Sequence, residues 1–188
     1  MNLSSENTPC VSLPTGIRTA LADSPNCEER NQVPATVRAV KRILLADDDP
    51  GVREMLGRVL ESENFEVVPA KTGEETAKRF AAHVPDLVLL DLNMPDGDGW
   101  SAFRFINSAQ PMLPVIIITA SPYEYERAVQ LGADALMEKP LNLSLLLQSI
   151  RELLAESPSA CMARLTNPNF KTNYLKLHHL AGDKDSNS

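Results

Sequence analysis

Five polar residues stand where short apolar runs of the sequence end. They are Asp47, Asp48, Asp91, Thr119 and Lys139. Carboxylates that share a shallow site repel one another unless a cation joins them, and a hard divalent cation such as Mg²⁺ takes oxygen ligands. A carboxylate can attack phosphorus to give an acyl phosphate, and an ammonium group and a hydroxyl can offset the added negative charge. The residue types therefore predict a magnesium-dependent phosphoryl site in which Asp91 is the nucleophile.

These polar residues are separated by a regular alternation of predicted strands and helices, which extends from residue 41 to residue 157. Apolar and β-branched runs predict strands at 42–46, 66–69, 86–90, 115–119 and 133–138. A helical segment follows each strand, so right-handed crossovers should place helices on both faces of a parallel sheet. We expect an α/β fold, a flavodoxin-like (βα)5 doubly wound sheet with strand order 2-1-3-4-5. Ligands bind at the carboxyl edge of such a sheet, where the five polar residues fall.

Capping patterns mark where several of the helices begin. Asp49 precedes a proline, a combination typical of an N-cap and the first helical residue. Residues 72–75 and 121–124 each have the spacing of a capping box. Trp100 and Phe103 lie on the helix after the third strand and are expected in the core. The helices are thus predicted from local signals as well as from their apolar faces.

Composition and charge exclude several classes of function. The net charge of −7 argues against non-specific nucleic-acid binding, which needs a basic surface. No run of about 18 or more apolar residues predicts a membrane-spanning helix. The start of the chain lacks the basic and apolar stretches of a secretory signal, so a cytoplasmic location is expected. The three cysteines, Cys10, Cys27 and Cys161, fit no metal motif and are expected to be free thiols.

Both ends of the chain differ in composition from the middle. Residues 1–40 are rich in proline and polar residues, so a disordered N-terminal arm is expected. Residues 158–188 are predicted to form a mostly disordered tail. Two alternatives are kept for residues 170–180, a short helix that docks on the domain or on a partner, and disorder. His178 and His179 could suggest a metal or phosphorelay site, but the sequence predicts no long paired helices to carry a phosphorelay histidine, so neither role is favoured. The middle, residues 41–157, is long enough for one core.

Four segments, taken in order, resemble the receiver domain of bacterial response regulators in two-component signalling. They are 43–50 (ILLADDDP), 86–99 (DLVLLDLNMPDGDG), 116–120 (IIITA) and 131–140 (LGADALMEKP). Each segment alone has moderate specificity, and all four at these separations are highly specific. The resemblance covers residues 42–156.

The resemblance implies a role for each acid of the predicted site. Asp91 would be phosphorylated by a sensor histidine kinase or a histidine phosphotransfer protein. Asp48 and Asp91 would bind Mg²⁺ directly, and Asp47 would bind it through water. Asn93 would contribute its backbone carbonyl to the metal. Mg²⁺ is therefore the expected cofactor.

The resemblance also assigns the switch and phosphate-binding residues. Thr119 would be the switch hydroxyl, and Lys139 would bind the phosphoryl group, with a cis peptide bond before Pro140. The family usually has Phe or Tyr at the switch position occupied here by Leu136. In addition, the separation from Thr119 to Lys139 is slightly shorter than is common in the family. We expect phosphoryl chemistry to be kept and signal output to be unusual.

The leading hypothesis is a stand-alone receiver without an output domain, which signals by binding an unknown downstream protein. It would bind neither DNA nor membranes and would not be an enzyme beyond its own phosphorylation and dephosphorylation. One alternative is an adaptor of receiver fold that acts without phosphorylation. A less favoured alternative is a haloacid-dehalogenase-like phosphatase using Asp47 and Asp49 as its Asp-x-Asp motif. The residues after Asp49, Pro50-Gly51, argue against this last class.

Overall fold

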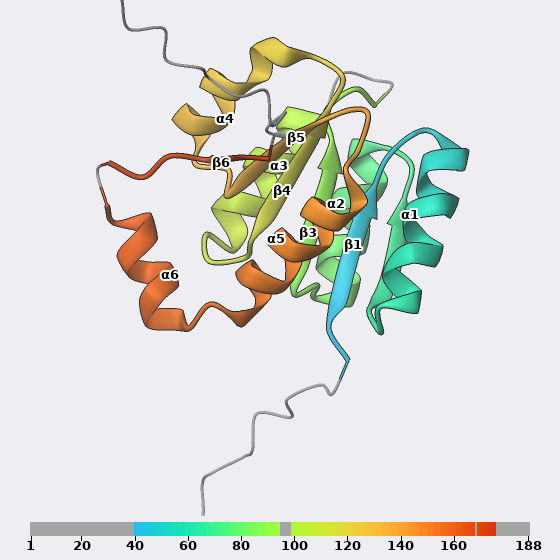
Figure 1. Cartoon of the computed structure of the whole chain (residues 1–188), viewed down its shortest axis with the longest axis horizontal. Coiled ribbons are helices and arrows are strands. Elements are labelled where there is room, and N and C mark those ends of the chain that lie inside the picture. Colours follow the sequence, from blue (N-terminus) through green and yellow to red (C-terminus); the bar gives the residue numbers. More distant parts are fainter. Residues whose placement is uncertain (1–39, 95–98, 168, 176–188) are drawn as a thin grey trace, which may run out of the picture. The chain divides into compact units, whose positions relative to one another are not determined.

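The computed structural model describes residues 40–94, 99–167 and 169–175. The chain divides into two units, 1–37 and 38–188, and all the described residues belong to the second. Its strands are β1 (Arg42–Ala46), β2 (Glu66–Ala70), β3 (Leu87–Asp91), β4 (Val115–Thr119), β5 (Ala135–Glu138) and β6 (Asn173–Leu175) (Figure 1). Its helices are α1 (Pro50–Ser62), α2 (Gly73–His83), α3 (Gly99–Ala109), the short 3-10 helix η1 (Pro122–Glu124), α4 (Tyr125–Leu131), α5 (Leu143–Ala155) and α6 (Pro158–Leu165).

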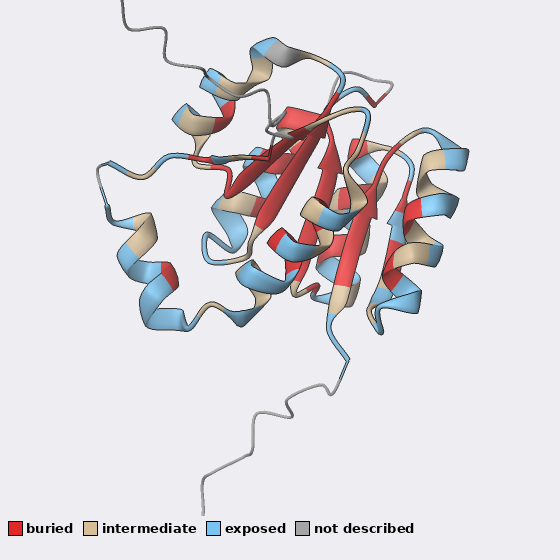
Figure 2. Cartoon of the chain, viewed as in Figure 1, coloured by how far each residue is buried: buried red, intermediate tan, exposed pale blue. Residues whose placement is uncertain are grey.

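The strands form one parallel sheet in the order β2-β1-β3-β4-β5-β6. The predicted doubly wound sheet with order 2-1-3-4-5 is therefore confirmed, with one further strand added at its edge. Strands β1, β3 and β4 are buried along nearly their whole length (Figure 2). Such continuous apolar strands are typical of a sheet covered by helices on both faces.

Each face of the sheet packs on its own set of helices. One core contains apolar residues of α2, α3 and α4, among them Phe80, Phe103 and Ala128. The other contains residues of α1 and α5, such as Leu56 and Ile150. Alternate residues along a strand point to opposite faces, so each central strand contributes to both cores. This arrangement leaves the carboxyl edge of the sheet to the loops that follow the strands.

Two of the three predicted helix starts are confirmed. The Asp49 carboxylate accepts hydrogen bonds from the backbone N–H groups of Gly51 (2.7 Å) and Val52 (3.1 Å), and these bonds lower the pKa of Asp49. Thr72 Oγ1 accepts from the N–H of Glu75 at 3.1 Å. These caps satisfy backbone donors that the first turn of a helix leaves without partners.

The capping box predicted at Ser121 is wrong. The Ser121 side chain makes no cap hydrogen bond, and the segment after it is the 3-10 helix η1, with α4 beginning only at Tyr125. The backbone N–H of Ser121 instead donates to Thr119 Oγ1 at 3.0 Å. Glu124, the other residue of the predicted box, instead accepts from Trp100 Nε1 at 3.1 Å.

The prediction of a mostly disordered tail is wrong for the described part of residues 158–175. Helix α6 begins after Ser157, whose Oγ accepts from the N–H of Ala160 at 3.2 Å. Strand β6 then pairs with β5, and Leu175 and Cys161 are both buried. The predicted boundary at residue 157 missed these elements because non-local contacts hold them.

Other predictions for the ends of the chain lie outside the described residues. They concern the arm 1–39, Cys10, Cys27 and the final segment 176–188 with His178 and His179. Cys161 is a free, buried thiol, and burial raises its pKa. Within the described part of the chain, none of the helices is both long and apolar enough to cross a membrane.

Candidate functional site

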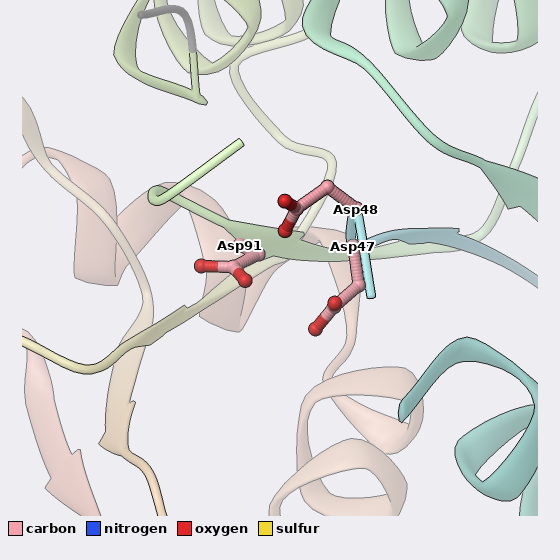
Figure 3. Close-up of side chains that lie close together, drawn as sticks. All are labelled: Asp47, Asp48 and Asp91. Atoms are coloured by element: carbon pink, nitrogen blue, oxygen red, sulfur yellow. The ribbon is translucent and has the colours of Figure 1, made fainter. Parts of the chain in front are cut away.

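Three acids meet at the carboxyl edge of the sheet. Asp47 and Asp48 follow β1, and Asp91 ends the neighbouring strand β3. One carboxylate oxygen from each of the three lies within 4.8 Å of the others (Figure 3). Asp47 and Asp91 are almost fully buried, at 0% and 1% exposure, and Asp48 is more exposed. The structure thus brings together the three acids that the sequence assigned to a metal.

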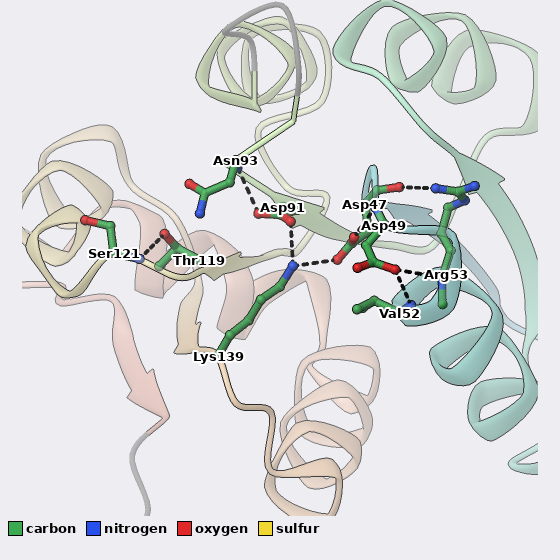
Figure 4. A network of polar contacts seen from close by, with 10 residues as sticks. Asp47, Asp49, Val52, Arg53, Asp91, Asn93, Thr119, Ser121 and Lys139 are labelled. Carbon is green, nitrogen blue, oxygen red and sulfur yellow. Dashed lines mark hydrogen bonds and ion pairs between the residues drawn. The ribbon is translucent and has the colours of Figure 1, made fainter.

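Lys139 joins two of these acids across the sheet edge. Its Nζ donates to Asp91 Oδ2 at 2.6 Å and to Asp47 Oδ2 at 3.0 Å (Figure 4). The peptide bond between Lys139 and Pro140 is cis, as the resemblance implied. Partial burial lowers the pKa of Lys139, but hydrogen bonds and charge attraction from Asp91 and Asp47 outweigh it, so the pKa lies above its usual value. Lys139 is therefore a fixed positive charge beside Asp91.

The site carries more negative charge than Lys139 can offset. Burial raises the pKa of Asp47, and the nearby Asp91 charge raises it further, although Lys139 and the Asp49 N–H act in the opposite direction. Three carboxylates face one ammonium group at this edge. Three carboxylates, one of them on the more exposed Asp48, are oxygen ligands that fit a hard divalent cation such as Mg²⁺.

Thr119 and Asn93 complete the surroundings of Asp91. Asn93 donates its backbone N–H to Asp91 Oδ1 at 2.9 Å, which fixes the orientation of the carboxylate. Thr119 ends β4 and is fully buried. Its carbonyl oxygen accepts from the Lys139 N–H at 2.8 Å, so the ends of β4 and β5 hold the two residues side by side. Leu136 lies in β5, three residues before Lys139 in the sequence, and is also fully buried.

Sequence reasoning missed two residues that support the acids. Arg53, on α1, donates from Nη1 to the backbone carbonyl of Asp47 at 2.7 Å and so ties the loop after β1 to the helix. Gly99 packs against the backbone of β3: a Cβ at this position would lie 2.5 Å from Leu92 Cα and 2.6 Å from the Asp91 carbonyl oxygen. The one sequence signal for this close contact between Gly99 and the backbone after β3 is that Gly99 directly precedes the predicted core residue Trp100.

Trp100 connects the helix beside Asp91 with the segment that follows Thr119. It is buried as predicted, and it contacts Phe103 edge to face at 5.7 Å. Its Nε1 donates to Glu124 Oε2 at 3.1 Å, and the guanidinium of Arg127 lies 4.8 Å from the ring centre. A hydrogen bond and a cation–π contact therefore join α3 to η1 and α4.

Comparison with known proteins defines the class to which this fold and site belong. Residues 43–151 match the family model of the response regulator receiver domain. That match covers more than half of the chain, so the chain belongs to this family. Receiver domains of this family act in two-component signalling. Phosphorylation and Mg²⁺ binding are typical of the family.

Individual relatives agree with this assignment. The transcriptional regulatory protein GlrR of Escherichia coli is 39% identical over 120 residues, which are 63% of this chain and 27% of GlrR. The response regulator MprA of Mycolicibacterium vanbaalenii is 40% identical over 60% of this chain and 50% of MprA. The chain thus spans about a quarter to a half of the length of these curated relatives.

Two solved structures show the same fold. A CheY-like receiver domain protein from Methanospirillum hungatei has a TM-score of 0.59 and 31% identity, and the match covers 62% of this chain and 94% of that one. The response regulator TrrA of Thermotoga maritima, solved in complex with Mg²⁺-BeF, has a TM-score of 0.57 and 32% identity over 61% and 99% of the two chains. In each case the match leaves out more than a third of this chain.

Proposed function

We propose that this chain is a response-regulator receiver that accepts a phosphoryl group on Asp91. The donor would be the phosphohistidine of a sensor histidine kinase or of a histidine phosphotransfer protein. A carboxylate oxygen of Asp91 forms the new bond to phosphorus while the bond from phosphorus to the histidine nitrogen breaks. The observation that carries this proposal is the position of Asp91, buried among two further acids and bonded to Lys139.

The other site residues would have distinct roles in this transfer. Asp47, Asp48 and Asp91, with the backbone carbonyl of Asn93, would hold Mg²⁺, which supplies neutralisation of the phosphoryl charge. Lys139 already contacts Asp91 and would pair with the phosphoryl oxygens. The Thr119 hydroxyl would donate a hydrogen bond to a phosphoryl oxygen, and its movement would couple phosphorylation to the rest of the domain.

The position of Asp49 argues against the haloacid-dehalogenase-like alternative. That mechanism needs two acids of an Asp-x-Asp motif in one site. Here the Asp49 carboxylate caps α1 and is not part of the acid cluster formed by Asp47, Asp48 and Asp91. We therefore disfavour a phosphatase of this class and propose that the chemistry of the chain is its own phosphorylation and dephosphorylation.

Signal output would occur through phosphorylation-dependent binding of a downstream protein in the cytoplasm, without direct contact to DNA. The relatives include proteins named as transcriptional regulators and a protein-glutamate methylesterase from Anaeromyxobacter dehalogenans, which is 43% identical over 53% of this chain and 30% of its own length. This chain spans less than a third of the length of each of these two relatives.

The decisive experiment compares phosphorylation of Asp91→Asn with that of the unchanged chain. Purified protein is incubated with Mg²⁺ and acetyl phosphate, and the added phosphoryl mass is located by mass spectrometry of the intact chain and its peptides. We expect labelling on Asp91 alone, which is lost in Asp91→Asn and after removal of Mg²⁺ by a chelator. Asp49→Ser is the matched control, because serine keeps the helix cap and the acid cluster is untouched. Undiminished labelling of Asp91→Asn would refute the assignment.

A further inference from the structure

Strand β6 covers the edge of the sheet next to β5. Its three residues pair in parallel with Ala135, Leu136 and Met137. The N–H of Asn173 donates to the carbonyl of Asp134 at 2.9 Å, and the side chain of Leu175 is buried in the core on the α1 and α5 side. The segment lies beyond residue 151, where the match to the receiver family model ends. A strand from outside the matched receiver segment therefore covers this edge of the sheet.

Two stacked tyrosines attach β6 to the first residue of α4. The rings of Tyr125 and Tyr174 lie 4.8 Å apart at an angle of 17°. Tyr125 also donates its hydroxyl to the carbonyl oxygen of Thr172 at 3.2 Å. Tyr174 lies opposite Leu136 in the strand register. An aromatic contact thus sits beside the switch position that Leu136 occupies, although it is supplied by β6 and α4.

A short segment links this contact to the phosphoryl site. Thr119 ends β4, and its Oγ1 accepts from the N–H of Ser121. The single-turn helix η1 follows, and Tyr125 comes directly after it. Any movement of the Thr119 hydroxyl toward Asp91 must therefore be absorbed within this segment or transmitted to Tyr125. Glu124, which is bonded to Trp100, limits how much η1 can absorb.

We propose that β6 is a regulatory strand, held on the β5 edge by Tyr125 while Asp91 is unmodified and released when a phosphoryl group on Asp91 draws Thr119 and the start of α4 toward the site. This inference rests on the proposed function of Asp91. Release would expose the edge of β5 and the side of α4 as a surface that the downstream protein can bind.

The attachment of β6 is weak enough to be switched. Three residues are at the lower limit of strand length, and short edge strands gain little from their ladder. Among the described residues, Thr172 Oγ1 is buried without a hydrogen-bond partner, which is a cost that release would remove. Phosphorylation has to remove only the stack and the hydrogen bond of Tyr125, a perturbation of the size that differential ligand binding can supply. The Asn173 bond to Asp134 and the burial of Leu175 are then the contacts left to oppose release.

Hydrogen exchange with and without beryllofluoride and Mg²⁺ tests the proposal. Beryllofluoride mimics the acyl phosphate, and its binding at Asp91 is followed independently by fluorine NMR. We expect the amides of residues 172–175 to exchange roughly tenfold faster in the complex, as for loss of a stacked pair and a hydrogen bond. Residues 66–70 in β2, at the opposite edge, serve as the internal control. Binding without faster exchange in 172–175 would overturn this inference alone, whereas no binding would overturn the proposed function as well.

Variants of Tyr125 separate the proposed link from a general loosening of the domain. In Tyr125→Leu, β6 should exchange rapidly in both states, so that beryllofluoride produces no further change. Since coupling between two sites is reciprocal, the variant should also bind beryllofluoride several-fold more tightly. Tyr125→Phe, which keeps the ring, should show an intermediate effect. Tyr123→Leu is the matched control, because Tyr123 is 89% exposed on the same segment. Equal responses in Tyr125→Leu and Tyr123→Leu would overturn the inference.

Discussion

Replacement of Arg164 by alanine should destabilise the domain by leaving a buried carboxylate without its cation. Arg164 pairs with Asp134 and, at 2.9 Å, with Glu156; the side chains of Arg164 and Asp134 are only 18% and 7% exposed. Removing one partner of a buried ion pair costs roughly 3–5 kcal/mol. Asp134 Oδ2 keeps its bond from the Val115 N–H at 2.7 Å, and Arg164 is partly exposed, so we expect about 2–3 kcal/mol.

The pH dependence of this loss identifies its cause. Burial raises the pKa of Asp134 although the Val115 N–H and Arg164 act against it, so removal of Arg164 must raise the pKa further. A carboxyl group with a raised pKa contributes its full stability below its unfolded pKa and loses it as the pH rises through the folded pKa. The destabilisation by Arg164→Ala should therefore be largest near neutral pH and shrink as the pH falls through the raised pKa of Asp134.

Urea unfolding of both proteins, at about pH 7.5 and about pH 5.5, measures this difference. The matched control is Arg151→Ala, because Arg151 pairs with Glu63 on the surface, with side chains 56% and 36% exposed. Such a pair should contribute only about 0–1 kcal/mol, with little pH dependence in this range. An Arg164→Ala penalty as small as that of Arg151→Ala, or one that grows toward acidic pH, would refute the reasoning.

Three further predictions concern the acid cluster and its support. Mg²⁺ should raise the urea midpoint of the unchanged chain, and a chelator should reverse this, because a cation that binds only the folded acids stabilises the fold. Lys139→Met should lower stability by about 1–3 kcal/mol without Mg²⁺, since Asp47 and Asp91 lose their ammonium partner, and by less with Mg²⁺; equal losses would argue against a shared site. Gly99→Ala should lower the melting temperature, because its Cβ would overlap the backbone at Leu92; an unchanged melting temperature would contradict this packing.

Local sequence signals were sufficient for the sheet and for the helix starts at Asp49 and Thr72. Apolar runs bounded by polar residues predicted the first five strands, and the predicted strand order was that of the flavodoxin-like fold to which the alternation of strands and helices was assigned. The same runs placed Asp47, Asp91 and Thr119 at strand ends. Their contacts with Lys139 then follow from the topology, because parallel strands bring their carboxyl ends to one edge.

Non-local contacts explain what the sequence did not predict. Helix α6 has a local start signal, Ser157 followed by Pro158, but the packing of this helix on the domain depends on the pairing of Arg164 with Asp134. Strand β6 has a weak local pattern and is held by its pairing with β5 and by the stack of Tyr174 on Tyr125. Likewise, Arg53 looked like one more charged residue on the exposed side of a helix. Its bond to the Asp47 carbonyl depends on where α1 returns against the loop after β1, which no local pattern encodes.

The two outer strands of the sheet also bear on how the protein behaves at high concentration. On one side β2 carries Pro69, which has no N–H to donate, and on the other side β6 is only three residues long. Both features hinder strand addition by a second chain. A chain shortened to residue 157 would instead end its sheet on β5, whose residues Ala135–Met137 are apolar. We therefore expect pairing of β6 with β5 to lower the tendency of the chain to self-associate through this edge.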